Sequence, residues 1–323
     1  MSGRNRSALA LTRLAAAYLL SLLLIEFVIA ERNPITALVT YIPQHPLLLP
    51  LLPPLLLSLL SRQWKLVVAN LLLLCLFLVL LMGFNARLPA SGDADLRVMT
   101  INLARSAVSV KAALGAIARE KPDIIFIQEA RPLSAKSDAI RAMIAAGHPS
   151  GVPWRLARTA DVAIASRRPL TSIRSIPLLE GSGRRLLIAQ VVFDGRQITV
   201  ACAHFSTNLR GASRRRPMAY LRGSARSRII QVRTLLAALP ARRTVIAGDF
   251  NLPPRGIAFS MISRKYKDTF SRGSGFGYTY RADLPVTRID HVFVSKDLAP
   301  AAWRAVDTGA SDHRAVVAEI ELP

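Results

Sequence analysis

The sequence predicts an α/β fold in which layered sheets carry helices on the outside, preceded by an N-terminal region of membrane helices. The amino-acid composition changes sharply near residue 90, from almost pure Leu, Ala and Val to a globular mixture. After that point many short apolar segments resemble strands, and several follow one another directly. Strands outnumber helices, which favours a layered sheet structure over a simple alternating doubly wound sheet.

Three apolar segments in the first 86 residues are candidate transmembrane spans, at residues 9–30, 46–61 and 66–86. The third is the clearest, because it holds no charged residue and roughly 20 apolar residues cross a bilayer. The second is short and contains four prolines, so we expect it to be kinked, or re-entrant rather than spanning. The first has an alternative interpretation as a signal peptide cleaved after Ala30, but the spans that follow favour an anchor.

Positive charges beside these spans predict the orientation of the chain. The N-terminal tail carries Arg4 and Arg6, and the connection between the second and third spans carries Arg62 and Lys65. Short loops rich in Lys and Arg stay in the cytoplasm. With three spans, we expect a multi-pass protein of a bacterial inner membrane whose globular part lies outside the cytoplasm. If the proline-rich segment does not cross, the globular part lies on the other side.

A linker at residues 87–95 separates the membrane region (1–86) from the globular domain (96–323). Apolar residues at helical spacing predict two helices in this domain, at residues 109–123 and 224–239. Apolar segments bounded by polar residues predict the strands. They lie at residues 96–104, 123–130, 161–169, 185–193, 197–205, 244–251, 288–295 and 313–322.

The formal net charge of +23, carried mostly by arginine, indicates a polyanionic partner, either a nucleic acid or an anionic membrane surface. The alternative is a general compositional preference for arginine on the surface. Segment 205–223 is unusually basic and would grip a polyanion, bind the membrane surface, or form a solvated loop. The two cysteines, Cys75 and Cys202, both lie in apolar segments, which argues against a disulfide framework and a Cys-based zinc site. No protein partner is inferred.

Polar residues recur where the predicted strands end. They are Asn102, Glu129, His204, Asp249, Asn251, Asp290, Asp312 and His313. Taken singly, such an Asn usually caps a turn and such a His is usually structural. Buried carboxylates are costly unless they are paired or bound to a metal, so their recurrence at one kind of strand end predicts a shared site. In the stretch "GDFN", strand alternation would point Asp249 and Asn251 to the same side.

The order of the motifs TIN, QE, H, GDFN, RIDH and SDH resembles the endonuclease/exonuclease/phosphatase superfamily, over about residues 96–321. That group includes deoxyribonuclease I, apurinic endonucleases, neutral sphingomyelinases and inositol-phosphate 5-phosphatases. The GDFN and SDH motifs are the most specific. The resemblance implies a four-layer α/β sandwich, with two packed mixed β-sheets flanked by helices. It also implies an active site at the edge where strand ends from both sheets meet.

The resemblance implies a metal site at Glu129, with Asn102 and Asp312 beside it. Mg²⁺ prefers hard oxygen ligands and keeps several waters, so one or two carboxylates suffice to hold it. A divalent ion neutralises a phosphodiester and stabilises its leaving oxygen. We therefore expect Mg²⁺ as the cofactor, with Mn²⁺ as the alternative.

The resemblance also implies five catalytic residues. Asp249 matches the aspartate that handles the attacking water, and Asn251 the asparagine that holds the phosphate. His313 matches the closing histidine, Asp290 its aspartate partner, and His204 the histidine at the end of the middle strand. A histidine held by a carboxylate has a fixed tautomer and a stabilised cationic form, which offsets charge on a phosphoryl transition state.

Two features lie beyond these motifs. A residue that supports the middle-strand histidine is not matched securely, and Asp161 and Tyr220 are both candidates. The "GYTY" segment at residues 277–280 is the one candidate for an aromatic lip beside the site.

The function expected is a membrane-anchored, Mg²⁺-dependent phosphodiesterase that hydrolyses phosphate esters, with a nuclease favoured. The first alternative keeps the chemistry but takes a phospholipid or phosphoinositide as substrate. The second alternative is a catalytically silent module that binds polyanions. The expected partners are a polyanionic substrate, either nucleic acid or an anionic lipid head group, and the bilayer itself through the N-terminal spans.

Overall fold

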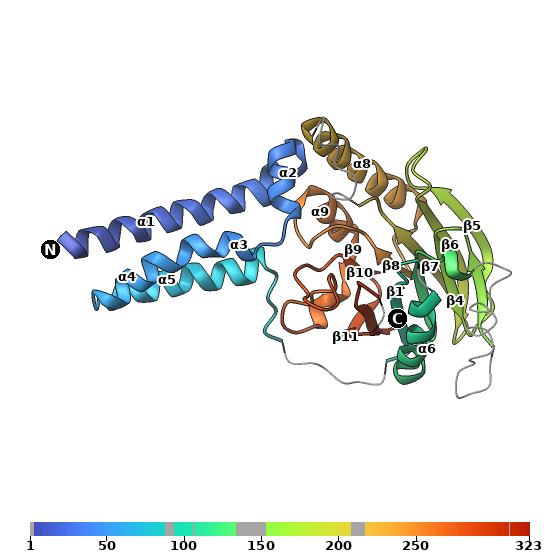
Figure 1. Cartoon of the computed structure of the whole chain (residues 1–323). Coiled ribbons are helices and arrows are strands. Elements are labelled where there is room, and N and C mark those ends of the chain that lie inside the picture. The colour runs from blue at the N-terminus through green and yellow to red at the C-terminus, as the bar shows by residue number, and fades with distance from the viewer. Residues whose placement is uncertain (1–2, 88–93, 106, 134–152, 208–216, 310) are drawn as a thin grey trace.

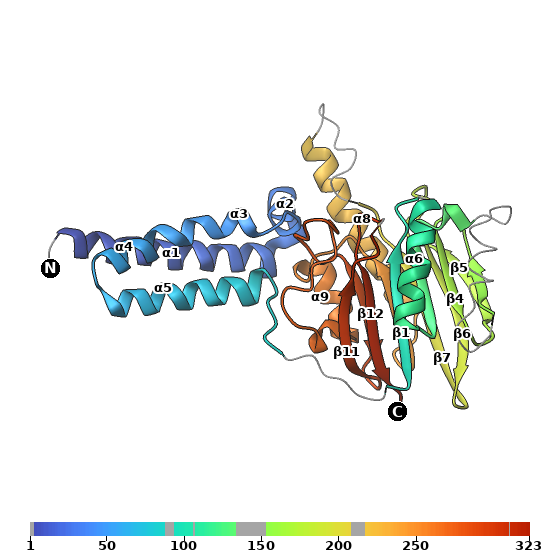
Figure 2. The same ribbon diagram turned by 60° about the horizontal axis from the view of Figure 1, so that its bottom comes forward.

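The computed structural model describes residues 3–87, 94–105, 107–133, 153–207, 217–309 and 311–323. A bundle of apolar helices extends from one side of a globular domain (Figure 1). In that domain two six-stranded mixed sheets pack face to face, with helices on their outer faces (Figure 2). The four-layer α/β sandwich expected from the sequence is therefore confirmed.

The first sheet has the spatial order β11-β12-β1-β2-β4-β3. Its strands are β1 (Leu96–Asn102), β2 (Ile124–Gln128), β3 (Arg155–Arg158), β4 (Val162–Ser166), β11 (Ala299–Val306) and β12 (Ala315–Glu321). Only β1 and β2 are parallel neighbours in this sheet. A parallel pair needs a crossover connection, which α6 (Ala107–Glu120) supplies.

The second sheet has the order β5-β6-β7-β8-β10-β9. Its strands are β5 (Thr171–Pro177), β6 (Arg185–Phe193), β7 (Arg196–His204), β8 (Thr244–Asp249), β9 (Tyr266–Asp268) and β10 (Asp290–Ser295). Here β7 and β8 are the parallel pair, and α8 (Pro217–Ala238) lies between them in the chain. The predicted strands all formed, whereas the short β3 and β9, the exposed β5 and the longer, partly buried β11 were not predicted.

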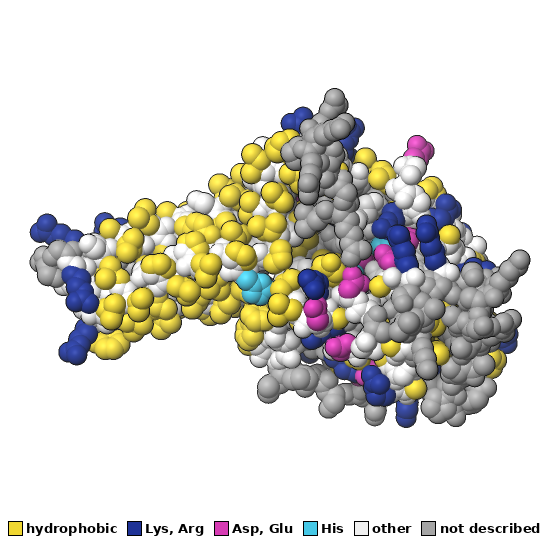
Figure 3. All heavy atoms as spheres, viewed as in Figure 1, with side chains coloured by type: hydrophobic (Ala, Val, Ile, Leu, Met, Phe, Trp, Pro, Cys, Tyr) yellow, Lys and Arg dark blue, Asp and Glu magenta, His cyan; other side chains and the backbone are white. Residues whose placement is uncertain are grey.

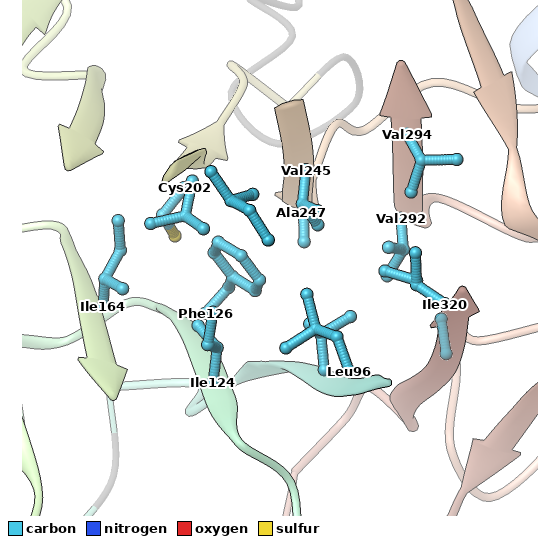
Figure 4. Close-up of a cluster of buried hydrophobic side chains, with 14 of the residues drawn as sticks. Leu96, Ile124, Phe126, Ile164, Cys202, Val245, Ala247, Val292, Val294 and Ile320 are labelled. Carbon is cyan, nitrogen blue, oxygen red and sulfur yellow. The ribbon is translucent and has the colours of Figure 1, made fainter. Parts of the chain in front are cut away.

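The main core lies between the two sheets, where their inner faces meet. Figure 4 shows side chains of both sheets pointing toward one another. They include Leu96, Ile124, Phe126, Ile164 and Ile320 from the first sheet and Cys202, Val245, Ala247, Val292 and Val294 from the second. Full burial of such an apolar side chain stabilises the fold by about 1.5–3 kcal/mol. Cys202 is a free thiol here and packs as a small apolar residue.

Helices cover the outer face of each sheet. On the first sheet α6 buries Val110, Ala113, Ala116 and Ile117. On the second, α8 and α9 (Gly256–Lys265) pack around Phe250 and Phe293. The helices therefore cover the outer faces of the two sheets and not the edge where β1, β7 and β8 end.

The N-terminal helices form an antiparallel bundle. It comprises α1 (Gly3–Leu24), η1 (Ile25–Ile29), η2 (Ala30–Arg32), α2 (Pro34–Tyr41), α3 (His45–Leu48), η3 (Leu49–Leu51), α4 (Leu52–Leu60), α5 (Trp64–Leu76) and η4 (Phe77–Leu81). The Arg4 guanidinium donates to the Leu60 carbonyl at 2.9 Å, so the N-terminal tail lies beside the α4–α5 turn. The chain thus runs toward the globular domain, back, and toward it again.

Two helices, Arg4–Arg32 and Trp64–Leu81, are long and apolar enough to cross a membrane. The pair Pro34–Tyr41 and His45–Leu60, bent by 94°, makes a third if it counts as one span. This bend lies at residues 42–44, before the proline-rich segment 46–61, whereas a kink was expected within that segment. The third predicted span extends five residues too far, because Gly83 adopts φ +76°, a left-handed conformation that ends helices.

A polar cluster ties three of these helices together. The Asn70 side chain on α5 donates to Thr12 Oγ1 on α1 at 2.9 Å and to Ser58 Oγ on α4 at 3.0 Å. All three side chains are buried. Interhelical hydrogen bonds of this kind fix helix association where the surroundings are apolar.

The bundle is docked on the globular domain rather than tethered loosely to it. Arg255, 5 % exposed, donates to the carbonyls of Thr40 at 2.8 Å and Leu81 at 3.1 Å, and pairs with Glu26 at 3.0 Å. The Glu31 carboxylate accepts from the Ile257 backbone N–H at 2.7 Å, which caps the start of α9. These buried polar contacts fix the bundle to the loop and helix that follow β8.

The predicted linker is only partly described. Residues 88–93 lie outside the described part of the chain. At its start, Arg87 donates to the Ser271 carbonyl at 3.0 Å, and the neighbouring Asn85 pairs with Gly275 through backbone hydrogen bonds of 2.8 Å. The beginning of the expected linker is therefore a second attachment to the globular domain.

Candidate active site

Three adjacent strands of the second sheet place polar side chains at one edge. His204 ends β7 and is paired in register with Asp249 at the end of β8. Asp290 begins the antiparallel strand β10 and is also in register with Asp249. All three side chains are at most 2 % exposed. The topology of the sheet therefore gathers them, although they are far apart in the sequence.

The first sheet brings two more predicted residues to the same edge. Asn102 ends β1, in register with Gln128, and Glu129 follows directly. The Asn102 Nδ2 donates to Asp249 Oδ2 at 3.0 Å, a hydrogen bond between the two sheets. Its Oδ1 accepts from the Ala104 backbone N–H at 2.9 Å. Asn102 thus fixes the Asp249 carboxylate, while its predicted metal role remains a prediction.

The glycine of the GDFN motif has a steric reason. Gly248 has φ +151°, and a Cβ placed there would lie 1.9 Å from the Ala203 carbonyl oxygen of β7. Only glycine lets the two strands approach this closely without moving the backbone. The position just before Asp249 is therefore restricted by packing rather than by chemistry.

Asp249 and Asn251 line one cavity, but not for the reason expected from the sequence. The strand β8 ends at Asp249, and Asn251 adopts φ +49°, so strand alternation does not relate the two side chains. Instead the Asn251 backbone N–H donates to Asp249 Oδ1 at 2.9 Å. The Asn251 side chain also donates to the Phe205 carbonyl at 3.2 Å. A turn closed by the aspartate itself orients both groups.

His313 and Asp290 form the expected pair. His313 Nδ1 lies 2.9 Å from Asp290 Oδ2, and its Nε2 lies 3.9 Å from Asp249 Oδ2. Burial lowers the pKa of His313, but the carboxylates of Asp290 and Asp249 outweigh it and raise the pKa to about 10. His313 is therefore cationic at neutral pH. It lies two residues before β12, not at its start as expected.

The middle-strand histidine has the support that the sequence left open. His204 Nδ1 lies 3.2 Å from Asp161 Oδ1, and the Arg184 guanidinium contacts both, at 3.1 Å from that oxygen. Burial raises the pKa of Asp161, but its hydrogen bond with His204 and the Arg184 charge lower it below its usual range. Of the two candidates, Asp161 therefore contacts His204. Tyr220 lies on α8 instead.

These residues surround a cavity of about 630 Å³. All of the predicted site residues except Asp290 line it, and Asp290 reaches it through His313. Glu129, whose side chain is 14 % exposed, faces the cavity and lies 3.4 Å from Arg105. Asp312, 38 % exposed, faces it as well. These oxygen donors suit a hard divalent cation that retains several waters.

A second group also has metal-like spacing. One ligand atom each from Asp249, Asp290 and His313 lie within 4.8 Å of one another. In this group His313 already uses its Nδ1 in the hydrogen bond with Asp290. The spacing marks this group as a second candidate position for a metal ion, beside the one predicted at Glu129.

Several cavity residues were not found from the sequence. Arg105, Arg184 and Thr207 come from loops without a recognisable motif, and Tyr41 and Pro43 come from the N-terminal bundle. No local pattern marks them, because only the packing of distant segments brings them here.

The two remaining sequence expectations are corrected in part. In the GYTY segment, the Tyr280 ring lies 4.9 Å from the His313 ring and lines the cavity, but Tyr278 turns away to the Met82 carbonyl. Of the basic segment 205–223, residues 217–223 are the first turns of α8 rather than a loop. Residues 208–216 lie outside the described part of the chain.

Comparisons with known proteins agree with this geometry. The sequence model of the Endonuclease/Exonuclease/phosphatase family matches residues 99–313. No curated protein sequence matches the chain. An endonuclease/exonuclease/phosphatase from Beutenbergia cavernae is similar in structure, with 22 % identity, a TM-score of 0.52, and 70 % of this chain and 71 % of that chain covered.

Two further solved structures share the fold. The human Nocturnin catalytic domain with bound sulfate has 17 % identity and a TM-score of 0.55, covering 73 % of this chain and 94 % of that chain. Danio rerio TDP2 in complex with a single-strand DNA product has 17 % identity and a TM-score of 0.52, covering 70 % of this chain and 98 % of that chain. At these identities the likeness concerns the fold.

Proposed function

Because the chain belongs to the endonuclease/exonuclease/phosphatase family, whose enzymes are divalent-metal-dependent phosphoester hydrolases, we propose that it is a membrane-anchored, Mg²⁺-dependent hydrolase of phosphate esters. The observation that carries the proposal is His313, which Asp290 holds at 2.9 Å and which faces the same cavity as Glu129 and Asp249. A silent binding module would not need a buried histidine–aspartate pair and further carboxylates lining the same cavity.

The proposed division of roles follows from the contacts. Glu129, with Asp312 and Asn102 beside it, would hold the metal, which when bound neutralises the phosphate and stabilises the leaving oxygen. Asp249, fixed by the Asn102 amide at 3.0 Å, orients the attacking water.

The remaining groups handle charge on the phosphate. His313 presents a cationic Nε2–H toward the non-bridging oxygens, and Asp290 holds that ring in place. Asn251 keeps one amide hydrogen for a phosphate oxygen, since Phe205 accepts the other. His204 borders the cavity with its ring fixed by Asp161.

Membrane insertion is the second part of the proposal. Figure 3 shows an apolar surface along the bundle, with Lys and Arg side chains gathered at its free end. The hydrogen bond of Arg4 to Leu60 places the N-terminal tail and the turn with Arg62 together at that end. By the preference of short basic loops for the cytoplasm, this supports three crossings of a bacterial inner membrane, with the catalytic domain, residues 96–323, outside the cytoplasm.

For the substrate, a nucleic acid remains the first candidate. The net charge of +23 favours a polyanion, and a protein of the same fold, TDP2, has been seen with a single-strand DNA product.

One observation favours a lipid phosphoester as the second candidate. Tyr41 and Pro43, at the bend of the membrane bundle, form part of the cavity wall, so the cavity borders the segment that would lie at the bilayer surface. A phosphate at the head-group level would be close to this wall.

The test uses the full chain, because the bundle contributes to the cavity. The protein in lipid nanodiscs with Mg²⁺ is assayed on plasmid DNA, RNA, and vesicles containing sphingomyelin or phosphoinositides. A His313→Ala variant serves as the matched control for contaminating activity. Hydrolysis of at least one substrate that needs both Mg²⁺ and His313 is expected. The proposal would be refuted if the wild type and His313→Ala hydrolyse a substrate equally fast, or if the wild type hydrolyses none of the four substrates.

A further inference from the structure

A second cavity lies where the membrane bundle meets α8, and we call it the junction groove. Its volume is about 410 Å³. Four arginines line it, together with one glutamate and apolar side chains. The arginines are Arg32, Arg222, Arg226 and Arg233, and the other residues are Glu31, Pro34, Ala225, Ile229 and Ile230. Among the described residues, this groove and the active-site cavity share no lining residue.

The four arginines of the junction groove have no ion-pair partner among the described residues. All four arginines are exposed, and within the described chain none forms an ion pair with a carboxylate. Glu31 is already used, because its carboxylate accepts hydrogen bonds from Ile257, Ala258 and Tyr41. The groove therefore presents guanidinium groups that suit the oxygens of a phosphate.

The sequence of α8 puts these charges on one face. Arg222, Arg226, Ile229 and Arg233 recur at spacings of four and three residues, which share a side of a helix. The opposite side is buried, and there the Arg228 guanidinium lies 4.4 Å over the ring of Tyr41. That contact clamps α8 to α2, so the groove is preformed.

The position of the groove matches the level of lipid head groups. Arg32 is the last residue of the apolar helix Arg4–Arg32. The lining includes the exposed apolar side chain of Ile230, and two more exposed apolar side chains, Ile35 (59 %) and Met218 (43 %), lie near the lining residues in sequence, on α2 and α8. A rim of apolar side chains beside guanidinium groups is the arrangement expected at the boundary between acyl chains and phosphates.

We propose that the junction groove binds the phosphate-bearing head group of an anionic phospholipid in the leaflet that faces the globular domain. This inference rests on the membrane insertion proposed above, but not on hydrolysis. Apart from Glu31, which caps α9, the described lining offers no acid, base or nucleophile, so the lipid is a bound partner rather than a substrate. Its binding would hold α8, and with it the catalytic domain, at a fixed angle to the bilayer.

The test compares lipids retained by the full chain. The protein is taken from membranes of phosphatidylcholine mixed with phosphatidylglycerol, and bound lipids are counted by native mass spectrometry. The wild type is expected to retain phosphatidylglycerol in preference. The triple variant Arg222→Gln, Arg226→Gln, Arg233→Gln should lose that preference, by roughly fivefold per arginine removed. The charge-matched control Arg155→Gln, Arg158→Gln, Arg196→Gln changes exposed arginines on the sheets and should retain it.

Several results would overturn the inference. One is an unchanged preference in the triple variant, and another is an equal loss in the control. A third is full displacement of the lipid by inorganic phosphate, which would assign the groove to a soluble anion. Loss of DNA binding with lipid retention intact would assign it to nucleic acid. If the triple variant does not fold, the single variant Arg226→Gln is used instead. Its thermal unfolding is measured, and its preference for phosphatidylglycerol should fall by the amount expected for one arginine.

Two readouts separate this inference from the proposed function. Membrane fractionation of the triple variant shows whether insertion holds, and hydrolysis of a soluble phosphodiester shows whether catalysis holds. Both are expected to match the wild type. His313→Ala should show the reverse, with lipid preference kept and hydrolysis lost.

Discussion

His313 Nδ1 lies 2.9 Å from Oδ2 of Asp290, and this contact joins the segment before β12 to the start of β10. Asp290 belongs to the second sheet and His313 leads into a strand of the first, so the pair forms only when the sheets stack. It leaves Nε2 of the cationic ring facing the cavity beside Asp249.

The first prediction concerns this dyad. His313→Ala should lower kcat by about 10²- to 10³-fold, more than it raises KM, because the cation acts mainly on the transition state. Asp290→Asn should be impaired but measurable, since the imidazole remains without its partner. The double variant should be little worse than His313→Ala alone, because the two residues act as a unit. Strictly additive losses in kcat/KM would mean that they work independently.

The second prediction concerns pH. The pKa of His313 is raised from 6.5 to about 10, so its folded-state stabilisation is complete below about pH 6.5 and is lost as the pH rises through about 10. Activity that depends on the cation should fall over the same alkaline range. Asp290→Asn should move this fall to lower pH, because the largest of the carboxylate interactions that raise the pKa of His313 is removed. A pH–rate profile of kcat that is unchanged in Asp290→Asn would contradict the assignment.

The third prediction concerns the metal. Glu129→Gln should abolish metal-dependent hydrolysis while the domain stays folded, because the carboxylate that best fits the ion is lost. Mg²⁺ binding by calorimetry, together with thermal unfolding, separates loss of the ion from loss of the fold. Asp194→Asn, an exposed carboxylate in the β6–β7 turn, is the matched control. Unchanged turnover in Glu129→Gln at saturating Mg²⁺ would rule out this metal site.

The fourth prediction concerns the junction between bundle and domain. Arg255→Met leaves Glu26 buried without its cation, which should cost about 3–5 kcal/mol of stability. The double variant Glu26→Gln, Arg255→Met should recover part of this, because no charge then remains buried. Unfolding in detergent measures both. If the double variant is less stable than Arg255→Met, the loss of stability does not come from an unpaired Glu26 carboxylate.

The same junction predicts that the isolated residues 91–323 hydrolyse substrate more slowly than the full chain does. Without the bundle the cavity loses Tyr41 and Pro43, and Arg255 loses its carbonyl acceptors. The loop that contains Asn251 then has no support on that side.

The fifth prediction concerns sidedness. An alkaline phosphatase fused to the C-terminus should be active, because three crossings place that end outside the cytoplasm. A cytoplasmic reporter fused at the same position should be inactive. The opposite pair of results would mean that the segment Pro34–Leu60 does not cross.

The sequence alone determined the layered α/β class, the helical N-terminal region and nearly all of the strand-end residues that line the cavity. It could do so because burial periodicity and short motifs such as GDFN are local, and each constrains its own strand whatever lies beside it.

It could not predict that Arg184 contacts His204, or that Tyr41 lies in the cavity wall. These contacts depend on how segments far apart in the chain pack. It also gave the wrong reason for Asp249 and Asn251, since a hydrogen-bonded turn, not strand alternation, orients them. The tertiary structure decided that the N-terminal bundle contributes Tyr41 and Pro43 to the wall of the candidate active-site cavity. The physical reason is that Arg255, a buried charge that must be paired, finds its described ion-pair partner Glu26 across that junction.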